Sequence, residues 1–157
     1  MASYVPSVVG RINGARTVIW SVPEAASQTF LAGEFVCRTS GYLTVCGTDP
    51  ALILGIALED AHNSTAGAYN ILVAVATEDT LIQMSVHSAT PATNQIEQTD
   101  LGKAYEIEVA SNVWTIDKDA TTNTRVRIQK FVDAVGGGND TQGRVLVTVL
   151  AANREVQ

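Results

Sequence analysis

Residues capable of chemistry are few in this chain, and their spacing does not assemble a reactive group. The two histidines, His62 and His87, lie in unrelated segments, and neither has a metal-ligand spacing such as His-x-x-x-His. Cys37 or Cys46 could act as a nucleophile with a histidine as its base, but nothing in the spacing supports such a pair. The Gly-x-Ser-x-Gly motif of hydrolases is missing from the sequence. We therefore expect no enzymatic activity, no cofactor and no metal site.

Three polar patterns resemble ligand-binding loops but lack their essential residues. The glycines at 136–138 are followed by Asn-Asp-Thr-Gln-Gly and a strand, whereas a phosphate loop needs Gly-Lys-Ser/Thr before a helix. Residues 117–123 begin like a calcium loop but lack its central glycine and its late glutamate. The acids in Glu59-Asp60 and Glu78-Asp79 are adjacent, so each pair points to opposite faces of a strand and cannot share one catalytic cleft.

The two cysteines flank a predicted hairpin. If Gly41-Tyr42 forms a two-residue turn, Cys37 faces Cys46 across the two strands. They could form a disulfide, supply half of a zinc site, or remain two small buried thiols that a cytoplasm keeps reduced. We prefer the reduced thiols, because zinc needs about four ligands and neither histidine is close in sequence.

Short β-prone runs separated by turn residues make up most of the chain. Apolar residues do not recur at helical spacing over any long window, so the pattern predicts an all-β fold, an antiparallel β-barrel or sandwich of about nine strands. The nine strand candidates are residues 34–38, 43–46, 52–58, 70–77, 81–86, 103–109, 113–117, 124–132 and 143–151. We expect residues 23–157 to form one β-domain, in which a second β-subdomain could lie around 100–151.

The first 22 residues differ from the rest. They combine Pro6, Gly10 and Gly14 with many large apolar residues, and this density of Pro and Gly disfavours a helix or a long internal strand. We expect residues 1–22 to form an extended N-terminal arm on a neighbouring subunit, where residues 17–22 could add to a sheet edge. The alternative is that the segment packs on its own barrel as a first strand. The candidate partner-binding residues are Tyr4, Val5, Val8, Arg11, Ile12, Arg16, Val18, Ile19 and Trp20.

The distribution of charge excludes one class of partner. Residues 23–119 carry a net charge of −10, whereas residues 1–22 carry +2. Because phosphate binding needs clustered Lys and Arg, we expect no binding to nucleic acid. No stretch reaches the roughly 18 apolar residues of a membrane helix, and no secretory signal opens the sequence. We therefore expect synthesis in a cytoplasm and no membrane partner.

One region carries a resemblance. Leu-Ala-Gly-Glu-Phe-Val at 31–36, a short polar hairpin, and Ile-Leu-Gly-Ile-Ala-Leu-Glu-Asp at 53–60 resemble the opening module of tailed-phage capsid decoration (cement) proteins. The resemblance covers roughly residues 31–77. It implies a small β-barrel and a virion structural protein on the outer surface of the phage head, made in the host cytoplasm. It also implies binding to the major capsid protein, self-assembly as a homo-oligomer, most often a trimer, and an N-terminal arm that clasps a neighbour.

Two other functions fit an all-β chain without reactive groups. One is a tail or head–tail structural protein of the same particle. The other is a carbohydrate-binding β-sandwich, but such modules need exposed aromatic side chains, and the aromatic content here is only 6%. We therefore prefer the decoration protein, in which many weak contacts across several subunits act as one strong contact.

Overall fold

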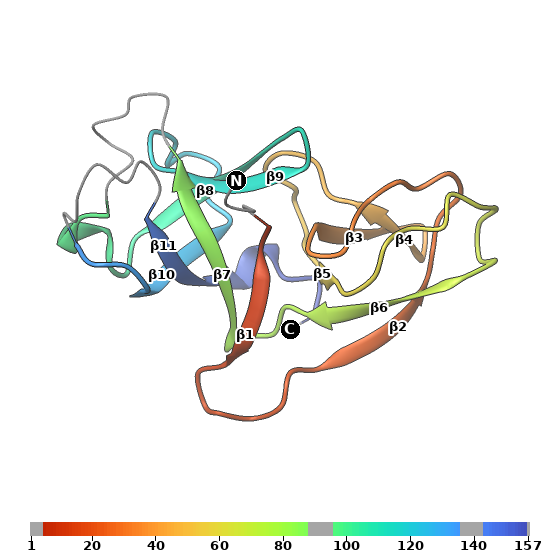
Figure 1. Cartoon of the computed structure of the whole chain (residues 1–157), viewed down its shortest axis with the longest axis horizontal. Coiled ribbons are helices and arrows are strands. Elements are labelled where there is room, and N and C mark those ends of the chain that lie inside the picture. The colour runs from red at the N-terminus through yellow and green to blue at the C-terminus, as the bar shows by residue number, and fades with distance from the viewer. Residues whose placement is uncertain (1–4, 88–95, 136–142, 157) are drawn as a thin grey trace.

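The computed structural model describes residues 5–87, 96–135 and 143–156, which fold mostly into β-strands and connecting turns (Figure 1). The strands are β1 (Ser7–Arg11), β2 (Ile19–Pro23), β3 (Phe35–Thr39), β4 (Tyr42–Val45), β5 (Gly55–Ala57), β6 (Asn70–Val75), β7 (Thr80–His87), β8 (Ala104–Ala110), β9 (Val113–Asp117), β10 (Val126–Phe131) and β11 (Arg144–Val149). Two short 3₁₀ helices are η2 (Gln98–Asp100) and η3 (Ala151–Asn153). The all-β expectation is confirmed.

The strand count is higher than expected, because two strands lie in the segment predicted as an arm. Each of the nine predicted segments overlaps one strand, β3 to β11, and β1 and β2 are additional. β1 pairs with β7, and β2 pairs with β6. The extended arm is therefore not confirmed: among the described residues, the N-terminal segment takes the alternative course and packs on its own chain. The expected boundary at residue 22 falls inside β2.

The first sheet holds five strands in the order β2-β6-β5-β3-β4, and all neighbours are antiparallel. Its two edge strands meet at one parallel bridge between Glu24 and Leu43, where the Ala25 N–H donates to the Leu43 carbonyl at 2.9 Å. We call this unit the N-terminal barrel.

The second sheet closes fully. Its strands follow the order β7-β11-β10-β8-β9, and β9 pairs with β7 in parallel to complete the ring. The expectation of an antiparallel fold is therefore wrong at this strand pairing and at the parallel bridge between Glu24 and Leu43. β1 adds to the first half of β7 as a sixth strand. We call β7 to β11 the C-terminal barrel; the subdomain predicted around 100–151 contains four of its strands but not β7.

The two barrels share one strand order and one register. If the five strands of each barrel are numbered in chain order, starting from β2 and from β7, the strand order in both barrels is 1-5-4-2-3. Both barrels close by a parallel contact between strands 1 and 3. Their hairpins turn through Ser40-Gly41 and Ser111-Asn112, all with positive φ, as two-residue type I′ turns require. When the hairpins are superimposed, the other pairings place the following residues at matching positions: Val22 and Ile82, Glu24 and Met84, Leu43 and Trp114, Ala57 and Val126, Ile71 and Val147. The molecule is thus built from two copies of one five-stranded design.

A continuous core joins the barrels. Buried side chains of the C-terminal barrel pack together with Phe35 and Ile56 from the N-terminal barrel. The Trp114 ring meets Phe35 edge-on with ring centres 5.2 Å apart, and its Nε1 donates to the buried Glu34 carboxylate at 3.1 Å. Nearby, the Asp49 carboxylate accepts the Ile107 N–H at 3.1 Å. The interior of the N-terminal barrel forms a second, separate apolar cluster.

The two ends of the described chain cross between the barrels. β1 comes before the N-terminal barrel in sequence but pairs with the C-terminal barrel. The tail after β11 returns to the N-terminal barrel, where Arg154 bridges to Ile53 and Glu155 pairs with Arg38. The N-terminal segment therefore contacts the C-terminal barrel, and the C-terminal tail contacts the N-terminal barrel.

The cysteines form a disulfide. The hairpin turn is Ser40-Gly41, one residue earlier than expected, so Cys37 lies opposite Thr44 and diagonal to Cys46. The Cα atoms of the two cysteines are 5.4 Å apart, and their sulfur atoms are joined. The preferred interpretation of two reduced thiols is therefore wrong for this structure.

Candidate interaction surface

The residues predicted to bind a partner do not form a single surface. Val8 and Val18 are partly buried and pack against the first and second apolar clusters. Their side chains pack within this chain, and their role in binding a partner stays a prediction. Tyr4 lies outside the described residues.

Arg11 is engaged within the chain. Its Nε donates to the Asp79 carboxylate at 2.7 Å, which ties the end of β1 to the start of β7. Burial alone would raise the pKa of Asp79, but the hydrogen bonds from Arg11 and from the Thr77 hydroxyl outweigh it, so the pKa lies below its usual range. Arg11 therefore fastens the N-terminal segment to the body.

Val5 and Pro6 dock against the start of β3. Gly33 has a φ of +95°, and a Cβ at this position would lie 1.9 Å from Val5 Cγ1 and 3.2 Å from the Pro6 carbonyl oxygen. Only glycine fits both the backbone conformation and the close approach. Pro6 is buried, whereas Val5 stays 42% exposed.

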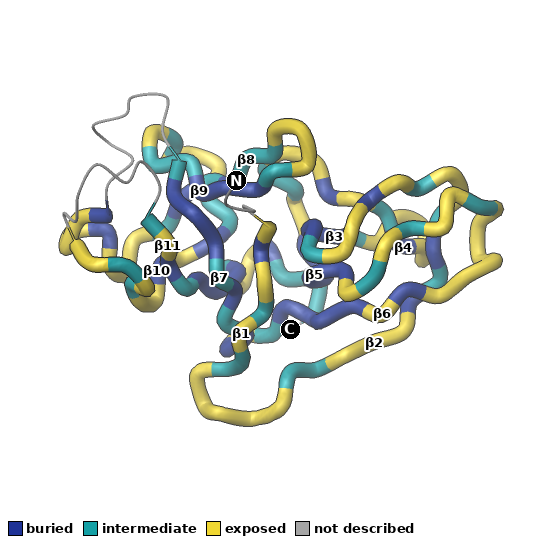
Figure 2. The backbone as a smooth tube through the Cα atoms, viewed as in Figure 1, coloured by how far each residue is buried: buried dark blue, intermediate teal, exposed yellow. Residues whose placement is uncertain are grey.

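The connection between β1 and β2 projects from the body and carries the first outward-facing candidates. This projecting loop, residues 12–18, extends beyond the two sheets along the lower border in Figure 1, and Figure 2 shows most of it exposed. Ile12 begins the loop with a backbone hydrogen bond to Asp79 at 2.9 Å, and its side chain is 59% exposed. Arg16 is exposed near the far end. Ile12 and Arg16 are therefore available to a partner.

A second set of exposed apolar side chains lies on the outer face of the N-terminal barrel. We call Ile19, Leu58 and Leu72 the outer patch; they are 54%, 44% and 45% exposed. The Leu58 N–H donates to the Leu72 carbonyl at 2.9 Å, and Leu72 lies opposite Ser21 on β2. Residues opposite one another on antiparallel strands share a face, so the patch crosses β2, β6 and the residue that follows β5.

Of this patch, only Ile19 is among the residues that the sequence pattern predicted to bind a partner. Leu58 and Leu72 each come directly after a buried residue, Ala57 and Ile71. The change from buried to exposed was hidden because both segments are apolar on both faces. Their proximity depends on the strand pairing, which the sequence pattern alone does not show.

Trp20 is partly engaged. Its side chain is 36% exposed, and the Arg38 guanidinium carbon lies 5.8 Å from its ring centre. Arg38 also pairs with Glu155. A cation–π contact at an exposed site contributes about 0.5–1 kcal/mol. Trp20 therefore contacts Arg38 within the chain and still presents part of its ring to solvent.

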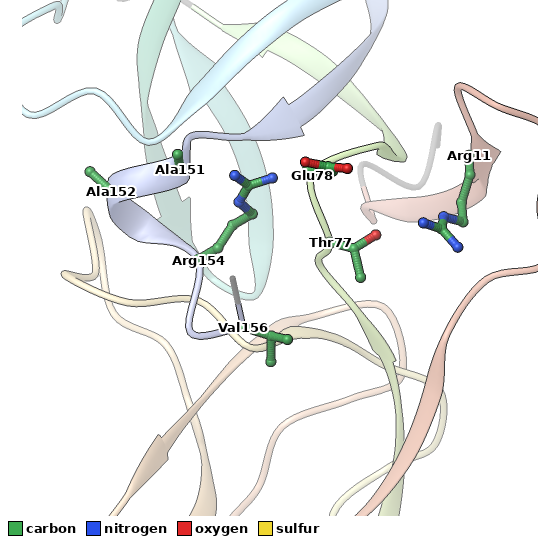
Figure 3. A pocket seen from close by; sticks show the side chains of 7 residues that line it. All are labelled: Arg11, Thr77, Glu78, Ala151, Ala152, Arg154 and Val156. Carbon is green, nitrogen blue, oxygen red and sulfur yellow. The ribbon is translucent and has the colours of Figure 1, made fainter.

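A depression of about 570 Å³ lies where the terminal segments meet the link between the barrels (Figure 3). It is lined by Arg11, Thr77, Glu78, Ala151, Ala152, Arg154 and Val156. In Figure 3 Arg154 reaches toward Glu78, and Arg11 lies on the opposite side. The Thr77 hydroxyl is hydrogen-bonded to Asp79 at 3.0 Å and to the Thr80 hydroxyl at 2.7 Å. The Thr77 hydroxyl is therefore held by partners within the chain.

The two histidines have structural partners. His62 Nδ1 lies 3.1 Å from the buried Glu24 carboxylate, and its ring stacks on Tyr69 with centres 4.1 Å apart. His87 Nδ1 is hydrogen-bonded to Glu108. Since both cysteines are in the disulfide, the Cys–His pair considered above is not formed. Residues 136–138 lie outside the described residues.

The described residues contain neither a cluster of metal ligands nor a helix that could span a membrane. No group of three or more His, Cys, Asp or Glu side chains in the described part of the chain could hold a metal ion. None of the helices found there has the length and apolar character needed to cross a bilayer. Comparison with known proteins found no matching family model, no matching curated protein and no matching solved structure.

Proposed function

We propose that this protein is a virion structural protein that decorates the outer surface of a tailed-phage head and strengthens it by contacts between subunits. It acts without catalysis, binds the major capsid protein and assembles with further copies of itself, with a trimer as the expected assembly on the shell. The observation that carries the proposal is the exposed apolar surface formed by Ile12 in the projecting loop and by the outer patch.

The apolar surface suits a permanent protein contact. Ile12, Ile19, Leu58 and Leu72 are each more than two-fifths exposed. Neighbouring exposed apolar side chains are typical of interaction sites. The projecting loop and β2 both lie along one border of the molecule in Figure 1, so a flat partner could reach both. The contact role expected of residues 1–22 is thus assigned to the loop and β2.

The body supports the same role. Two barrels with a shared core and crossed terminal segments form a firm platform, and the disulfide secures the hairpin of one of them. The acidic stretch 23–119 and the exposed Arg16 give the surface two signs of charge, which can orient docking on a shell.

The test is binding of purified protein to phage heads that lack it, measured by co-sedimentation. Ile12→Asp should weaken binding at least tenfold, because it places a charge in the apolar contact. Leu101→Asp is the matched control, since Leu101 is a 46% exposed apolar residue of the C-terminal barrel. Both variants should keep the β-rich circular dichroism spectrum of the wild type.

The location of the protein on the particle distinguishes a head decoration protein from a tail or head–tail protein. Labelled protein should be found on heads in intact virions, at a copy number comparable to that of the shell protein. Label confined to tails would replace the proposal with a tail or head–tail role. Absence from virions, or equal binding by the Ile12 and Leu101 variants, would contradict it.

A further inference from the structure

The likeness of the two barrels exposes one unfilled strand position. In the C-terminal barrel, the outer edge of the first strand, β7, is paired at all residues but Met84: β1 covers residues 80–83, and β9 pairs residues 85–87. The shared register places residues 20–23 of β2 at the positions of residues 80–83. In the N-terminal barrel, β4 meets the first-strand segment only at Glu24, and no strand in the described part of the chain covers the edge before it.

The open edge of β2 presents backbone groups that can pair. The Val75 N–H donates to the Val18 carbonyl at 2.8 Å, and the Glu24 N–H donates to the Tyr69 carbonyl at 2.9 Å. Backbone groups alternate in direction along a strand, so the even-numbered residues of β2 face β6. The N–H and C=O groups of Ile19 and Ser21 therefore point outward, away from β6. Figure 1 shows β2 along the lower border with no other element beyond it.

This edge lacks the features that keep edge strands apart. β1, the terminal strand of the other sheet, is interrupted by a bulge between Val8 and Gly10 and ends in Arg11. Bulges and charged residues of this kind discourage pairing with another chain. β2 has an unbroken five-residue register with β6 and no charged residue. Only Pro23, at its end, lacks an N–H.

We propose that β2 pairs edge to edge with β2 of a second copy of this chain, around a two-fold axis. A two-fold axis makes the two strands antiparallel, which is the direction that β1 takes on β7. The outward groups allow a register in which Trp20 lies opposite its own equivalent and Ile19 lies opposite Ser21 of the second copy. Four backbone hydrogen bonds then form between Ile19 and Ser21 of the two copies.

The same register extends the outer patch. Leu58, Leu72 and Ser21 lie in one row on the outer face, and Ile19 of the second copy continues that row across the axis. The contact therefore adds apolar burial to the backbone hydrogen bonds. It deepens the proposed function, since it states how copies meet, but it concerns the free protein and is tested without any shell. On a shell, the contact joins neighbouring trimers; in solution alone, it gives a dimer.

Ser21→Pro tests the contact with little demand on the fold. The change removes an N–H that points away from β6, and proline is tolerated at such positions on edge strands. Sedimentation equilibrium of the wild type should show a concentration-dependent dimer, and Ser21→Pro should weaken the association at least tenfold. Ser21→Ala, which keeps the N–H, should associate like the wild type, and circular dichroism should show that all three are folded.

Cross-linking tests the register. The only two cysteines of the chain are joined to one another, so introduced thiols would be the free ones. An oxidised mixture of Ile19→Cys and Ser21→Cys chains should give a covalent dimer faster than either variant alone. A wild type that stays monomeric to millimolar concentration, or equal cross-linking in all three samples, would overturn the proposal. Neither result bears on the proposed binding to phage heads, which the Ile12→Asp co-sedimentation assay tests separately.

Discussion

The N-terminal and C-terminal barrels follow one design but finish it differently. The C-terminal barrel closes through a three-residue parallel pairing and receives β1 on the remaining edge. The N-terminal barrel closes through one bridge and leaves the rest of β2 exposed. A repeated fold can therefore serve two purposes in one molecule, since one copy is sealed as a support and the other keeps an edge for contact.

The barrels also differ at matching positions inside their walls. Glu24, buried in the N-terminal barrel, matches the apolar Met84 and accepts hydrogen bonds from His62. Cys37 and Cys46 match Glu108 and Asp117, so the disulfide has no counterpart in the C-terminal barrel. The N-terminal barrel, which closes through a single bridge, thus has a disulfide and a buried, hydrogen-bonded Glu24 that the C-terminal barrel lacks.

The comparison predicts its largest effect for removal of the N-terminal segment. A chain that begins at residue 17 loses β1 but retains β2, so both barrels should keep their strands. A chain that begins at residue 23 loses most of a wall strand, including the buried Val22, and the N-terminal barrel should unfold. Hydrogen exchange would show this as lost protection of the amides in β3 to β6.

The two truncated chains serve as controls for one another. If β3 to β6 remain protected in the chain that begins at residue 23, then β2 is dispensable to the barrel. That result would restore the arm first expected for residues 1–22.

The next effect concerns matching core positions. Trp114→Ala should cost about 3–5 kcal/mol of unfolding free energy, because it opens a cavity at the junction and removes a hydrogen-bond donor from buried Glu34. Leu43→Ala, at the matching position, should cost about 2–5 kcal/mol and act within the N-terminal barrel. Urea unfolding measures both. A Trp114→Ala loss under 1 kcal/mol would show that the shared core does not hold the barrels together.

Sequence patterns predicted the all-β character and the location of β3 to β11, because runs of Val, Ile, Leu and Thr between turn residues are typical of strands. They did not predict β1, and they offered a strand at residues 17–22 mainly as an addition to a neighbouring subunit, because Pro and Gly are rare in internal strands. Gly10 borders the bulge and Pro23 ends an edge strand, and both positions tolerate these residues. The duplication was hidden because matching positions hold unlike residues, as Leu43 and Trp114 do.

The candidate site was predicted in part for a similar reason. Ile12 and Ile19 face outward as expected, but Val8 and Val18 turn inward. In a segment where most residues are apolar, hydrophobicity does not show which side chains face the core. That assignment depends on pairing partners distant in sequence.

Loss of the disulfide should have a smaller effect, confined to one barrel. Cys37 and Cys46 are nine residues apart, and cross-linking a loop of this length stabilises a fold by about 2–3 kcal/mol. Reduction, or Cys37→Ser with Cys46→Ser, should lower the urea midpoint and increase amide exchange in β3 and β4. Equal increases in β8 and β9, the matching hairpin, would show that the two barrels unfold only as one unit.

The smallest effect is a pH dependence at the junction. Burial and a hydrogen bond with Glu106 raise the pKa of Asp49 to about 6. A raised pKa means that protonated Asp49 stabilises the folded state at acidic pH and that this stabilisation is lost as pH rises through about 6. Asp49→Asn should therefore be more stable than the wild type at pH 8 and nearly equal to it at pH 4. Urea unfolding at several pH values measures this, and an unchanged pH profile in the variant would contradict it.

The crossed ends of the chain bear on how the molecule carries load. β1 holds the C-terminal barrel, and the tail with Arg154 and Glu155 holds the N-terminal barrel. Tension that draws the barrels apart is therefore shared by three routes: the covalent link between them, the strap formed by β1 and the strap formed by the tail. A cut at residue 78 would therefore separate each barrel from one of its contacts: the C-terminal half would lack β1, and the N-terminal half would lack the tail with Arg154 and Glu155.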